Sequence, residues 1–324
     1  MKEINKIMGP VEQEMIEFNT FFKSAVKSQV ALVDIITNYI IRRKGKQMRP
    51  MFVLLTAKMF GEINESSYTA ATLIELLHTA TLVHDDVVDD SYERRGFFSI
   101  NALWKSKAAV LIGDYLLSKG MLTALEKKEY DLLEIVSGAV KEISEGELYQ
   151  LQKSRKLNIK EDEYFEIIKK KTASLIAACT AVGPKSVGCD EATLEKMKSF
   201  GEYTGIAFQI RDDLFDYQKN GLIGKPVGND IKEKKLTLPL IHALENVSAS
   251  EKRKILKMIS SRNMNQKKLS EIIHFVHLNG GIDYASTKMT EYRDKAMETI
   301  SGFPDSAAKT SLIELVDYSI KRKK

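Results

Sequence analysis

Apolar residues recur every three or four positions along most of the chain, which is the spacing of one face of an α-helix. Polar and charged residues occupy the positions between them, and few segments alternate strictly as a half-buried strand would. The pattern therefore predicts long helices joined by short polar links. These helices are expected over residues 30–41, 51–60, 71–90, 108–126, 132–152, 161–183 and 193–218.

The links between the expected helices are rich in Gly, Pro and Asn, and none is long enough to be a disordered linker. No repeat of fixed period is present, which argues against a solenoid. Six prolines and 18 glycines are few for 324 residues, and 44% of the residues are apolar, so a large core can form. We therefore expect an all-α fold with one domain over residues 1–324, built as a single large helical bundle.

Charge and cysteine content narrow the class of protein. The net charge of +5 is modest, and the terminal "KRKK" reads as a solvated tail, so no nucleic-acid partner is expected. Cys179 and Cys189 cannot form a disulfide framework and lie in no CxxC pair, which indicates a reducing compartment. The charged N-terminus lacks the apolar core of a signal peptide, and no stretch reaches the ~18 apolar residues that span a bilayer. We expect a cytoplasmic protein without a transmembrane segment.

The stretch "LVHDDVVDDSYERRG" at residues 82–96 contains the first candidate for chemistry, a DDxxD pattern formed by Asp85, Asp86 and Asp89. On a helix, Asp85 and Asp89 share one face and Asp86 lies about 100° around it. Carboxylate oxygens suit hard cations, and Mg²⁺ is commonly held by one or two carboxylates together with substrate phosphates. A solvated acidic turn would explain a single such motif equally well.

The same spacing recurs in "FQIRDDLFDY", where Asp212, Asp213 and Asp216 lie in another apolar segment. Clustered carboxylates on packed helices repel one another unless a cation compensates them. Two such helices facing each other across a cavity could hold several divalent ions against one polyanion. The repetition therefore favours a metal–diphosphate site over two surface turns.

Basic and polar side chains complement this acidic pair of motifs. Arginine presents a planar fork to phosphate oxygens and lysine adds a point charge, so both would help to neutralise a diphosphate. A phosphohydrolase with a His-Asp metal pair is less consistent with the chain, which lacks further histidines in acidic surroundings. The candidates in these segments are Lys46, Arg49, Arg94, Arg95, Lys171 and Thr172.

From about residue 40 to the C-terminus, the ordered blocks of the sequence resemble the trans-type polyprenyl diphosphate synthases, most closely the long-chain octaprenyl and solanesyl type. The matching blocks are "GKQMRP", "ELLHTATLVHDDVVDDSYERRG", "VLIGDYLLSKG", "KKTASL" and "GIAFQIRDDLFDYQKNGLIGKPVGNDIKEKKLTLPLI". The resemblance implies the isoprenoid synthase fold, a helical bundle with a central cavity. It also implies head-to-tail condensation of isopentenyl diphosphate with an allylic diphosphate such as farnesyl diphosphate.

The resemblance further implies about three Mg²⁺ ions in each active site, a homodimer, and transient membrane contact when product is released. The residues it implies for the diphosphate of isopentenyl diphosphate are Lys46, Arg49, His78 and Arg95. Those it implies for the allylic diphosphate are Arg94, Lys171, Thr172, Gln209 and Lys225, and Lys235 matches a further family lysine. The main Mg²⁺ ligands would be Asp85, Asp89 and Asp212, supported directly or through water by Asp86, Asp213 and Asp216. The catalytic set would be Asp85, Asp89, Lys171 and Asp212.

The chain departs from the family pattern at two places. Lys234 occupies a position that is usually glycine, so a backbone approach that depends on glycine would be lost there. Phe97 and Phe98 follow Gly96, where the family often has a small residue and proline. We expect the loop at 234 and the flap at 97–98 to differ from the family pattern.

The residues one turn before the first motif bear on product length. Ala80 and Thr81 are small where short-chain members of the family tend to carry aromatic residues, so a growing chain should pass them. One isoprene unit is about as long as one helical turn, ~5.4 Å, and the expected helices supply roughly five to seven turns. We expect an octaprenyl-like product of roughly seven to ten units. If Leu77 or Ile74 stops the chain earlier, the product is geranylgeranyl diphosphate.

Two other classes of function remain as alternatives. A non-catalytic subunit that regulates a partner synthase would be expected to lose aspartates from one motif, and this chain retains both. A terpene cyclase usually carries a second motif with asparagine, serine and glutamate instead of "DDLFD", and it does not need Lys46, Arg49 and His78.

Overall fold

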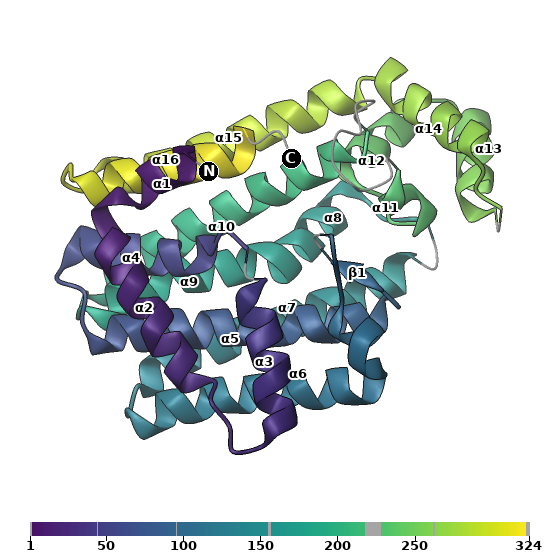
Figure 1. Ribbon diagram of the computed structural model, residues 1–324. Coiled ribbons are helices and arrows are strands. Elements are labelled where there is room, and N and C mark those ends of the chain that lie inside the picture. The colour runs from purple at the N-terminus through teal and green to yellow at the C-terminus, as the bar shows by residue number, and fades with distance from the viewer. Residues whose placement is uncertain are drawn as a thin grey trace. The chain divides into compact units, whose positions relative to one another are not determined.

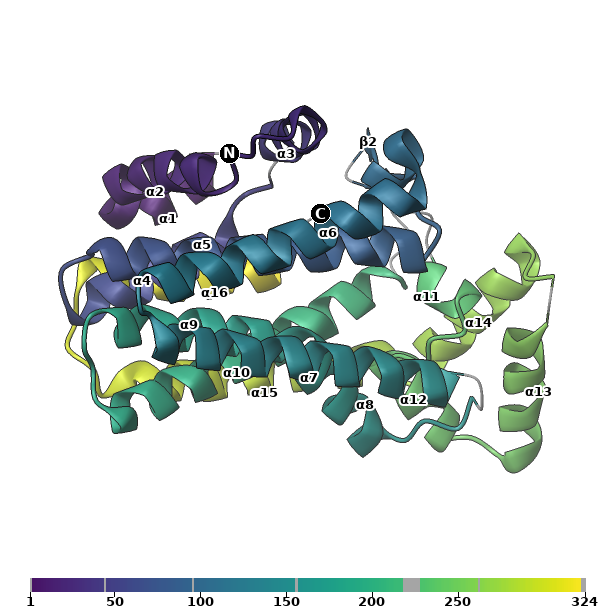
Figure 2. The same ribbon diagram turned by 90° about the horizontal axis from the view of Figure 1, so that it is seen from below.

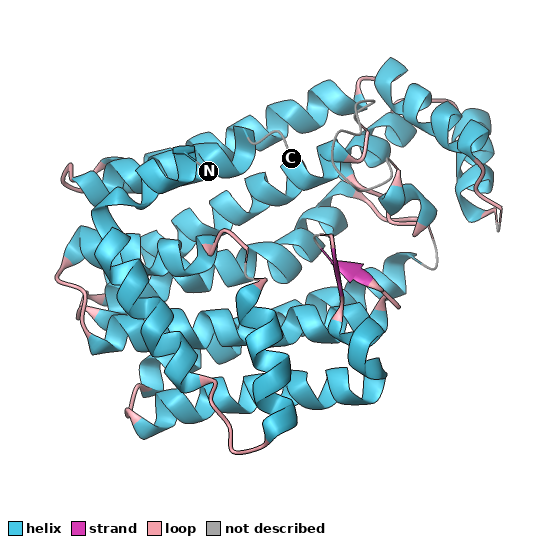
Figure 3. Cartoon of the chain, viewed as in Figure 1, coloured by secondary structure: helices cyan, strands magenta, loops and turns pink. Residues whose placement is uncertain are grey.

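Helices make up nearly all of the part of the chain that the structure describes. The structure is a computed structural model and describes residues 2–43, 45–94, 96–154, 157–217, 228–261 and 263–321 (Figure 1). Within these ranges the strands form a single short antiparallel hairpin, drawn in magenta in Figure 3. The predicted all-α class is therefore confirmed.

The chain folds into two compact units, each assembled from separate segments of the sequence. Unit 1 contains residues 1–140, 175–198 and 302–318, and unit 2 contains residues 141–174, 199–301 and 319–324. The single domain expected over residues 1–324 stays a prediction.

Unit 1 holds the N-terminal helices, the hairpin and the first acidic motif. Its elements are α1 (Lys2–Met8), the 3₁₀ helix η1 (Gly9–Val11), α2 (Glu12–Ala25), α3 (Ala31–Arg42), α4 (Met48–Phe60), α5 (Glu65–Val88), β1 (Glu93–Arg94), β2 (Phe97–Phe98) and α6 (Ile100–Glu126). It also includes the first part of α7 (Tyr130–Ser154) and of α10 (Glu191–Phe215), and most of α9 (Ser174–Ser186) and α16 (Ala307–Lys321).

Unit 2 holds the remainder of α7 and α10 and the second acidic motif. Its other elements are α8 (Glu161–Ile168), the π-helix η2 (Lys169–Ala173), α11 (Asn229–Lys232), α12 (Leu238–Glu245), α13 (Ala249–Ser260), α14 (Gln266–Leu278) and α15 (Gly281–Ser301). An extensive core of buried apolar residues joins these helices, and Tyr217, Ile210 and Ile272 are completely enclosed in it.

Helix α5 carries the first acidic motif at its C-terminal end and packs along α6 (Figures 1 and 2). Its N-terminus is closed by a capping box, in which the Ser67 amide donates to the Asn64 side chain at 3.2 Å. Glycines on α6 permit the close packing. A Cβ atom at Gly113 would lie 2.2 Å from Nε2 of His84, and one at Gly120 would lie 3.3 Å from the Leu73 side chain.

Two helices end earlier than the apolar pattern predicts. Helix α5 ends at Val88, not at residue 90, and Asp90 has a positive φ of 47°. Helix α10 ends at Phe215, not at residue 218. The expectation that each DDxxD motif lies wholly within a helix is therefore wrong. Apolar spacing does not mark the residue at which the hydrogen bonds of a helix stop, so the predicted ends are off by two or three residues.

Helix α6 is long and apolar enough, by length and composition alone, to cross a membrane, whereas the sequence was expected to contain no such stretch. A core helix of a soluble protein passes the same test, so the finding is weak evidence for a span. The helix is also interrupted near its start, where Lys105 has φ 69° and ψ 162°.

Candidate functional site

The first acidic motif, in unit 1, places its three carboxylates in different surroundings. Asp86 is buried, and Nε of Arg94 donates to its Oδ1 at 2.7 Å. Burial raises the pKa of Asp86, and the ion pair with Arg94 only partly opposes this shift. Asp85 is partly buried and Asp89 is exposed, and the Asp89 amide donates to the Asp85 carbonyl at 2.8 Å. The backbones of Asp85 and Asp89 thus stay one helical turn apart.

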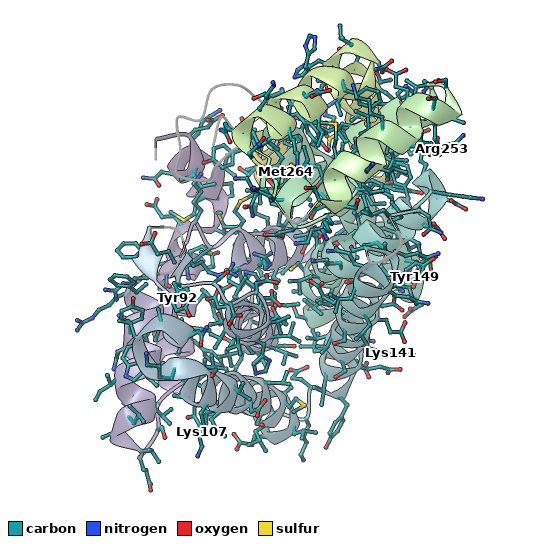
Figure 4. All side chains as sticks on the ribbon, turned by 90° about the vertical axis from the view of Figure 1, so that its right-hand side faces the viewer. Tyr92, Lys107, Lys141, Tyr149, Arg253 and Met264 are labelled. Atoms are coloured by element: carbon teal, nitrogen blue, oxygen red, sulfur yellow. The ribbon has the colours of Figure 1, made fainter. Side chains whose placement is uncertain are left out.

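The hairpin that follows this motif is attached to α3. The Tyr39 hydroxyl donates to the Phe98 carbonyl at 2.6 Å, and the Arg43 guanidinium lies 3.5 Å from the centre of the Tyr39 ring and 5.0 Å from that of Phe97. Tyr39 also packs edge-on against Trp104 at 5.2 Å. The side chains of Phe97 and Phe98 remain exposed, as does Tyr92, which is labelled in Figure 4. The hairpin is therefore held to α3 by the backbone of Phe98 and by the contact of Arg43 with the Phe97 ring, while both phenylalanine side chains stay exposed.

The residues predicted to bind isopentenyl diphosphate are also in unit 1. Lys46 is exposed, and its ammonium lies 4.9 Å from the centre of the Tyr318 ring. Arg49 is in the first turn of α4 and acts electrostatically on buried Cys179, whose pKa burial raises to about 12. His78 is partly buried in the middle of α5. Arg95 lies outside the described residues.

Unit 2 contains a cavity of ≈ 140 Å³ in which several predicted residues converge. Lys171, Thr172, Gln209, Asp213 and Lys235 all line it, although 64 positions separate the first from the last. The structure thus brings together most of the residues predicted for the allylic diphosphate. Lys225, the remaining one from the same unit, lies outside the described residues. The other lining residues are Gln150, Lys153, Ser154, Ile159, Tyr164, Ile167, Ile168, Asp230, Leu236 and Thr237.

Four side chains in the cavity wall form a continuous hydrogen-bond network. The Tyr164 hydroxyl donates to Oδ2 of Asp213 at 2.7 Å, and Nε2 of Gln209 donates to Oδ1 at 2.8 Å. The Thr172 hydroxyl donates to Oε1 of Gln209 at 2.7 Å. Burial raises the pKa of Asp213 to about 8, even though both hydrogen bonds oppose the shift. The buried Asp213 carboxyl thereby fixes the direction in which the Gln209 amide points.

The other two aspartates of the second motif differ from Asp213. Asp216 follows the end of α10, and its two carboxylate oxygens accept the backbone amides of Asn229 and Asp230, each at 2.9 Å. It therefore links the end of α10 to the start of α11. Asp212 is partly buried, near the last turn of α10. Asp212 is thus less buried than Asp213.

The loop at Lys234 has a backbone conformation that favours glycine. Lys234 has φ 60°, in the left-handed region, where a residue with a side chain costs roughly 1 kcal/mol or more. The next residue, Lys235, donates its amide to the Asp230 carbonyl at 2.8 Å and extends its side chain to the cavity. Lys234 thus adopts a backbone conformation that favours glycine, and the expected difference from the family pattern stays a prediction.

The segment that carries Lys171 and Thr172 is the π-helix η2, enclosed by glycines of two other helices. A Cβ atom at Gly146 of α7 would lie 2.9 Å from the Lys171 backbone nitrogen, and one at Gly205 of α10 would lie 2.5 Å from Cα of Ala173. π-Helical turns are often found at functional sites because they displace side chains from regular helical positions. The two glycines allow this turn to lie against both neighbours.

The donor sets of the two motifs fit Mg²⁺ but do not enclose it. Among the described residues, no three histidine, cysteine, aspartate or glutamate side chains converge closely enough to hold a metal ion by themselves. Mg²⁺ commonly takes one or two carboxylates and completes its octahedron with phosphate and water, so a closed protein cage is not required. Asp85 and Asp89 from unit 1 and Asp212 from unit 2 supply only oxygen donors. Their convergence on shared ions stays a prediction.

Sequence reasoning missed several residues of the cavity. Tyr164 precedes Lys171 by two helical turns and lies in the acidic stretch "EDEYFE", where no pattern marks it as part of a site. Lys153 and Gln150 lie on a charged face of α7, and the spacing of that face in the sequence does not distinguish it from an ordinary solvent-exposed helix face. Asp230 lies in the last of the sequence blocks that resemble the family, but whether its side chain reaches the cavity depends on the turn in which it lies.

Comparison with known proteins adds an independent finding. Residues 30–276 match the family model described as polyprenyl synthetase. The chain is 36% identical over 318 residues to an all-trans-nonaprenyl-diphosphate synthase (geranyl-diphosphate specific) of Rhodobacter capsulatus, covering 98% of this chain and 97% of that protein. It is 33% identical over 320 residues to the octaprenyl diphosphate synthase of Escherichia coli, covering 98% and 99%. A decaprenyl diphosphate synthase from Rhodobacter capsulatus superposes with a TM-score of 0.93 at 32% identity, covering 99% of each chain.

Proposed function

The chain belongs to the polyprenyl synthetase family, and on that premise we propose that it condenses isopentenyl diphosphate head-to-tail with an allylic diphosphate such as farnesyl diphosphate. The product is a long-chain all-trans polyprenyl diphosphate, octaprenyl-like and roughly seven to ten units long. The observation that carries the proposal is the cavity of unit 2, where Lys171, Thr172, Gln209 and Lys235 converge from three separate segments.

The side chains of this cavity have the chemistry needed to hold the allylic diphosphate. Lys171 and Lys235 offer ammonium donors to its oxygens, and Gln209 offers the amide hydrogen that Asp213 does not accept. As the carbon–oxygen bond breaks, negative charge grows on the diphosphate and these donors bind it more strongly. The isopentenyl double bond attacks the resulting allylic cation, and the proton that is lost passes to the released diphosphate. No nucleophilic side chain is required.

The proposal includes about three Mg²⁺ ions, bound by Asp85, Asp89 and Asp212. When bound, Mg²⁺ would neutralise charge on the leaving diphosphate. Asp86 is buried and accepts a hydrogen bond from Arg94, and Asp213 is buried and accepts hydrogen bonds from Tyr164 and Gln209. These contacts suit the supporting role expected of both aspartates better than direct coordination of Mg²⁺. Arg94 retains further N–H donors for substrate while one is given to Asp86.

The dimensions of α5 support a long product. The helix has 24 residues, or about seven turns, and one isoprene unit is about as long as one turn. Ala80 is buried and has no bulk to block the path, and the Thr81 hydroxyl donates to the His78 carbonyl at 2.9 Å. Leu77 and Ile74 are buried further along the same helix. The alternative, geranylgeranyl diphosphate, is favoured if these two side chains end the tunnel.

We also propose that the protein is a cytoplasmic homodimer that uses an exposed face of α6. Val110, Leu111, Met121, Leu122 and Leu125 are all exposed. At 100° per residue they lie within about 120° of one another on the helix. An exposed apolar stripe of this kind is typical of a protein interface. Light scattering on a purified sample should give twice the chain mass of 36.6 kDa, and a monomer at micromolar concentration would contradict this proposal.

Transient contact with a membrane during product release forms part of the same proposal. Val88, Tyr92, Phe97 and Phe98, which lie just before the hairpin and in its second strand, expose apolar surface close to the first motif in sequence. Aromatic side chains of this type partition to the interface between lipid and water. Faster turnover with added phospholipid vesicles would be the expected sign of such contact.

Product analysis tests the central proposal. Purified protein is incubated with farnesyl diphosphate, radiolabelled isopentenyl diphosphate and Mg²⁺, and the dephosphorylated products are separated by thin-layer chromatography. We expect linear products of roughly seven to ten units. A dominant product of four units would establish the shorter-chain alternative, and the absence of isopentenyl incorporation would reject the synthase proposal itself.

A further inference from the structure

The Lys171 ammonium is already paired in the cavity wall. It lies 2.5 Å from Oε1 of Glu147 and 3.4 Å from Oε1 of Gln150, both on α7 close to Tyr149, which is labelled in Figure 4. The side chains of Lys171 and Glu147 are 31% and 35% exposed, so the pair is neither fully solvated nor sealed. Glu147 is not among the residues that line the cavity, whereas Gln150 is. Glu147 therefore binds the Lys171 ammonium without itself lining the cavity.

Close approach of two helices produces this pair. Gly146 has no side chain, and its backbone lies against Lys170 and Lys171 of the π-helix. The residues on either side of Gly146 each meet a lysine: Glu145 binds Lys170 at 2.8 Å and Glu147 binds Lys171. The two pairs are thus adjacent and of the same kind, each a glutamate of α7 bound to a lysine of the π-helix. They differ in that Lys171 lines the cavity and Lys170 does not.

The pairing is not peculiar to Lys171. Each of the three lysines that line the described cavity has a glutamate partner: Lys153 pairs with Glu163, and Lys235 pairs with Glu233 at 2.5 Å. Asp213 and Asp230 add carboxyl groups to the lining itself. The lysines therefore do not present uncompensated positive charge to a ligand.

We infer that Glu147 is a positioning residue that holds Lys171 toward the cavity and also weakens the binding of diphosphate there. An ammonium group has three donors, so Lys171 can keep Glu147 while it binds a phosphate oxygen. The carboxylate then lies one ammonium group away from a polyanion, and like charges at that distance repel. Diphosphate is released from this site after every condensation, so weaker binding favours repeated turnover. This inference rests on the function proposed above.

Binding of inorganic pyrophosphate tests the inference without requiring catalysis. Isothermal titration calorimetry in excess Mg²⁺ compares the wild-type chain with Glu147→Gln, which keeps a hydrogen-bond acceptor for Lys171 but removes its charge. We expect the variant to bind pyrophosphate about three- to ten-fold more tightly. The variant loses both the ion pair that competes for Lys171 and the repulsion between Glu147 and the diphosphate, and together these are expected to contribute that factor. The KM for the allylic substrate should fall by a similar factor, and kcat should not rise. Glu147→Asp, which keeps the charge, should bind like the wild type.

Glu145→Gln is the matched control, because it removes the same charge from the adjacent pair with Lys170. It should change pyrophosphate affinity by less than two-fold. Unchanged or weaker binding by Glu147→Gln would overturn the inference, as would equal tightening in Glu145→Gln, since that would be a general effect of net charge. If the wild-type protein binds no pyrophosphate in the presence of Mg²⁺, the result counts against the proposed diphosphate site itself. That outcome is distinct from a failure of the inference about Glu147, in which the wild type binds pyrophosphate and Glu147→Gln does not bind it more tightly.

Discussion

The packing of α7 against the π-helix provides a sharp test of how this site is built. Helix α7 contains two glycines in different surroundings. Gly146 faces η2, and a Cβ atom there would lie 2.9 Å from both Cβ of Lys170 and the backbone nitrogen of Lys171. Gly138 is exposed on the same helix with no other atom within 4 Å of such a Cβ. Alanine at each position therefore makes the same chemical change with opposite structural consequences.

The expected magnitudes follow from these distances. Within a helix, alanine is favoured over glycine by roughly 0.5–1 kcal/mol, so Gly138→Ala should stabilise the protein by that amount. At Gly146 the same gain is opposed by overpacking. Ordinary contact begins at 3.4–4 Å, so the helices must separate by about 0.5–1 Å, at a cost of typically 1–3 kcal/mol. The net effect of Gly146→Ala should be a loss of about 1–2 kcal/mol.

Thermal unfolding followed by circular dichroism measures the first consequence. We expect the Tm of Gly138→Ala to rise by about 1–2 °C and that of Gly146→Ala to fall by about 2–4 °C. The second consequence is kinetic. Because the displaced backbone carries Lys171 and Thr172, kcat/KM of Gly146→Ala should fall by about ten- to a hundred-fold. Equal Tm changes and unaltered kcat/KM in the two variants would refute the view that close packing of α7 positions the cavity lysine.

Three further predictions concern the acidic motifs and the Lys234 turn. Asp85→Ala and Asp212→Ala should each lower turnover greatly while leaving the helical circular dichroism spectrum nearly unchanged, and full activity in either would contradict the assigned metal site. Burial raises the pKa of Asp213 from 3.8 to about 8, which favours its neutral form in the folded protein. Its contribution to stability is therefore complete below pH 3.8 and is lost as pH rises through 8, so Asp213→Asn should flatten the decline in unfolding free energy of the metal-free protein over that interval. Equal pH profiles for the two proteins would show that Asp213 is not the cause. Lys234→Gly should relieve the left-handed strain and, after the entropy cost of glycine, raise stability by up to about 1 kcal/mol, measurable in urea.

Much of the fold could be predicted because helical periodicity is a local property. The expected helices at 30–41, 51–60 and 108–126 correspond to α3, α4 and the larger part of α6. Their ends were less accurate, since a helix stops where its hydrogen bonds find other partners, as at Val88 and Phe215. The spacing of apolar residues indicates which side chains are buried, but it does not indicate where the backbone amides and carbonyls leave their helical hydrogen-bond partners.

The sequence by itself determined the class of fold, the two aspartate motifs and the set of lysines that accompany them, because each is written in local spacing or residue type. Tertiary structure alone decided what the individual members do. Asp213 accepts a hydrogen bond from Tyr164, 49 positions away, and Asp216 links two helix ends because it accepts the amide of Asn229. Glu147 and Lys171 meet because Gly146 allows two backbones to approach. Such roles depend on contacts between distant segments, and no local pattern specifies those contacts.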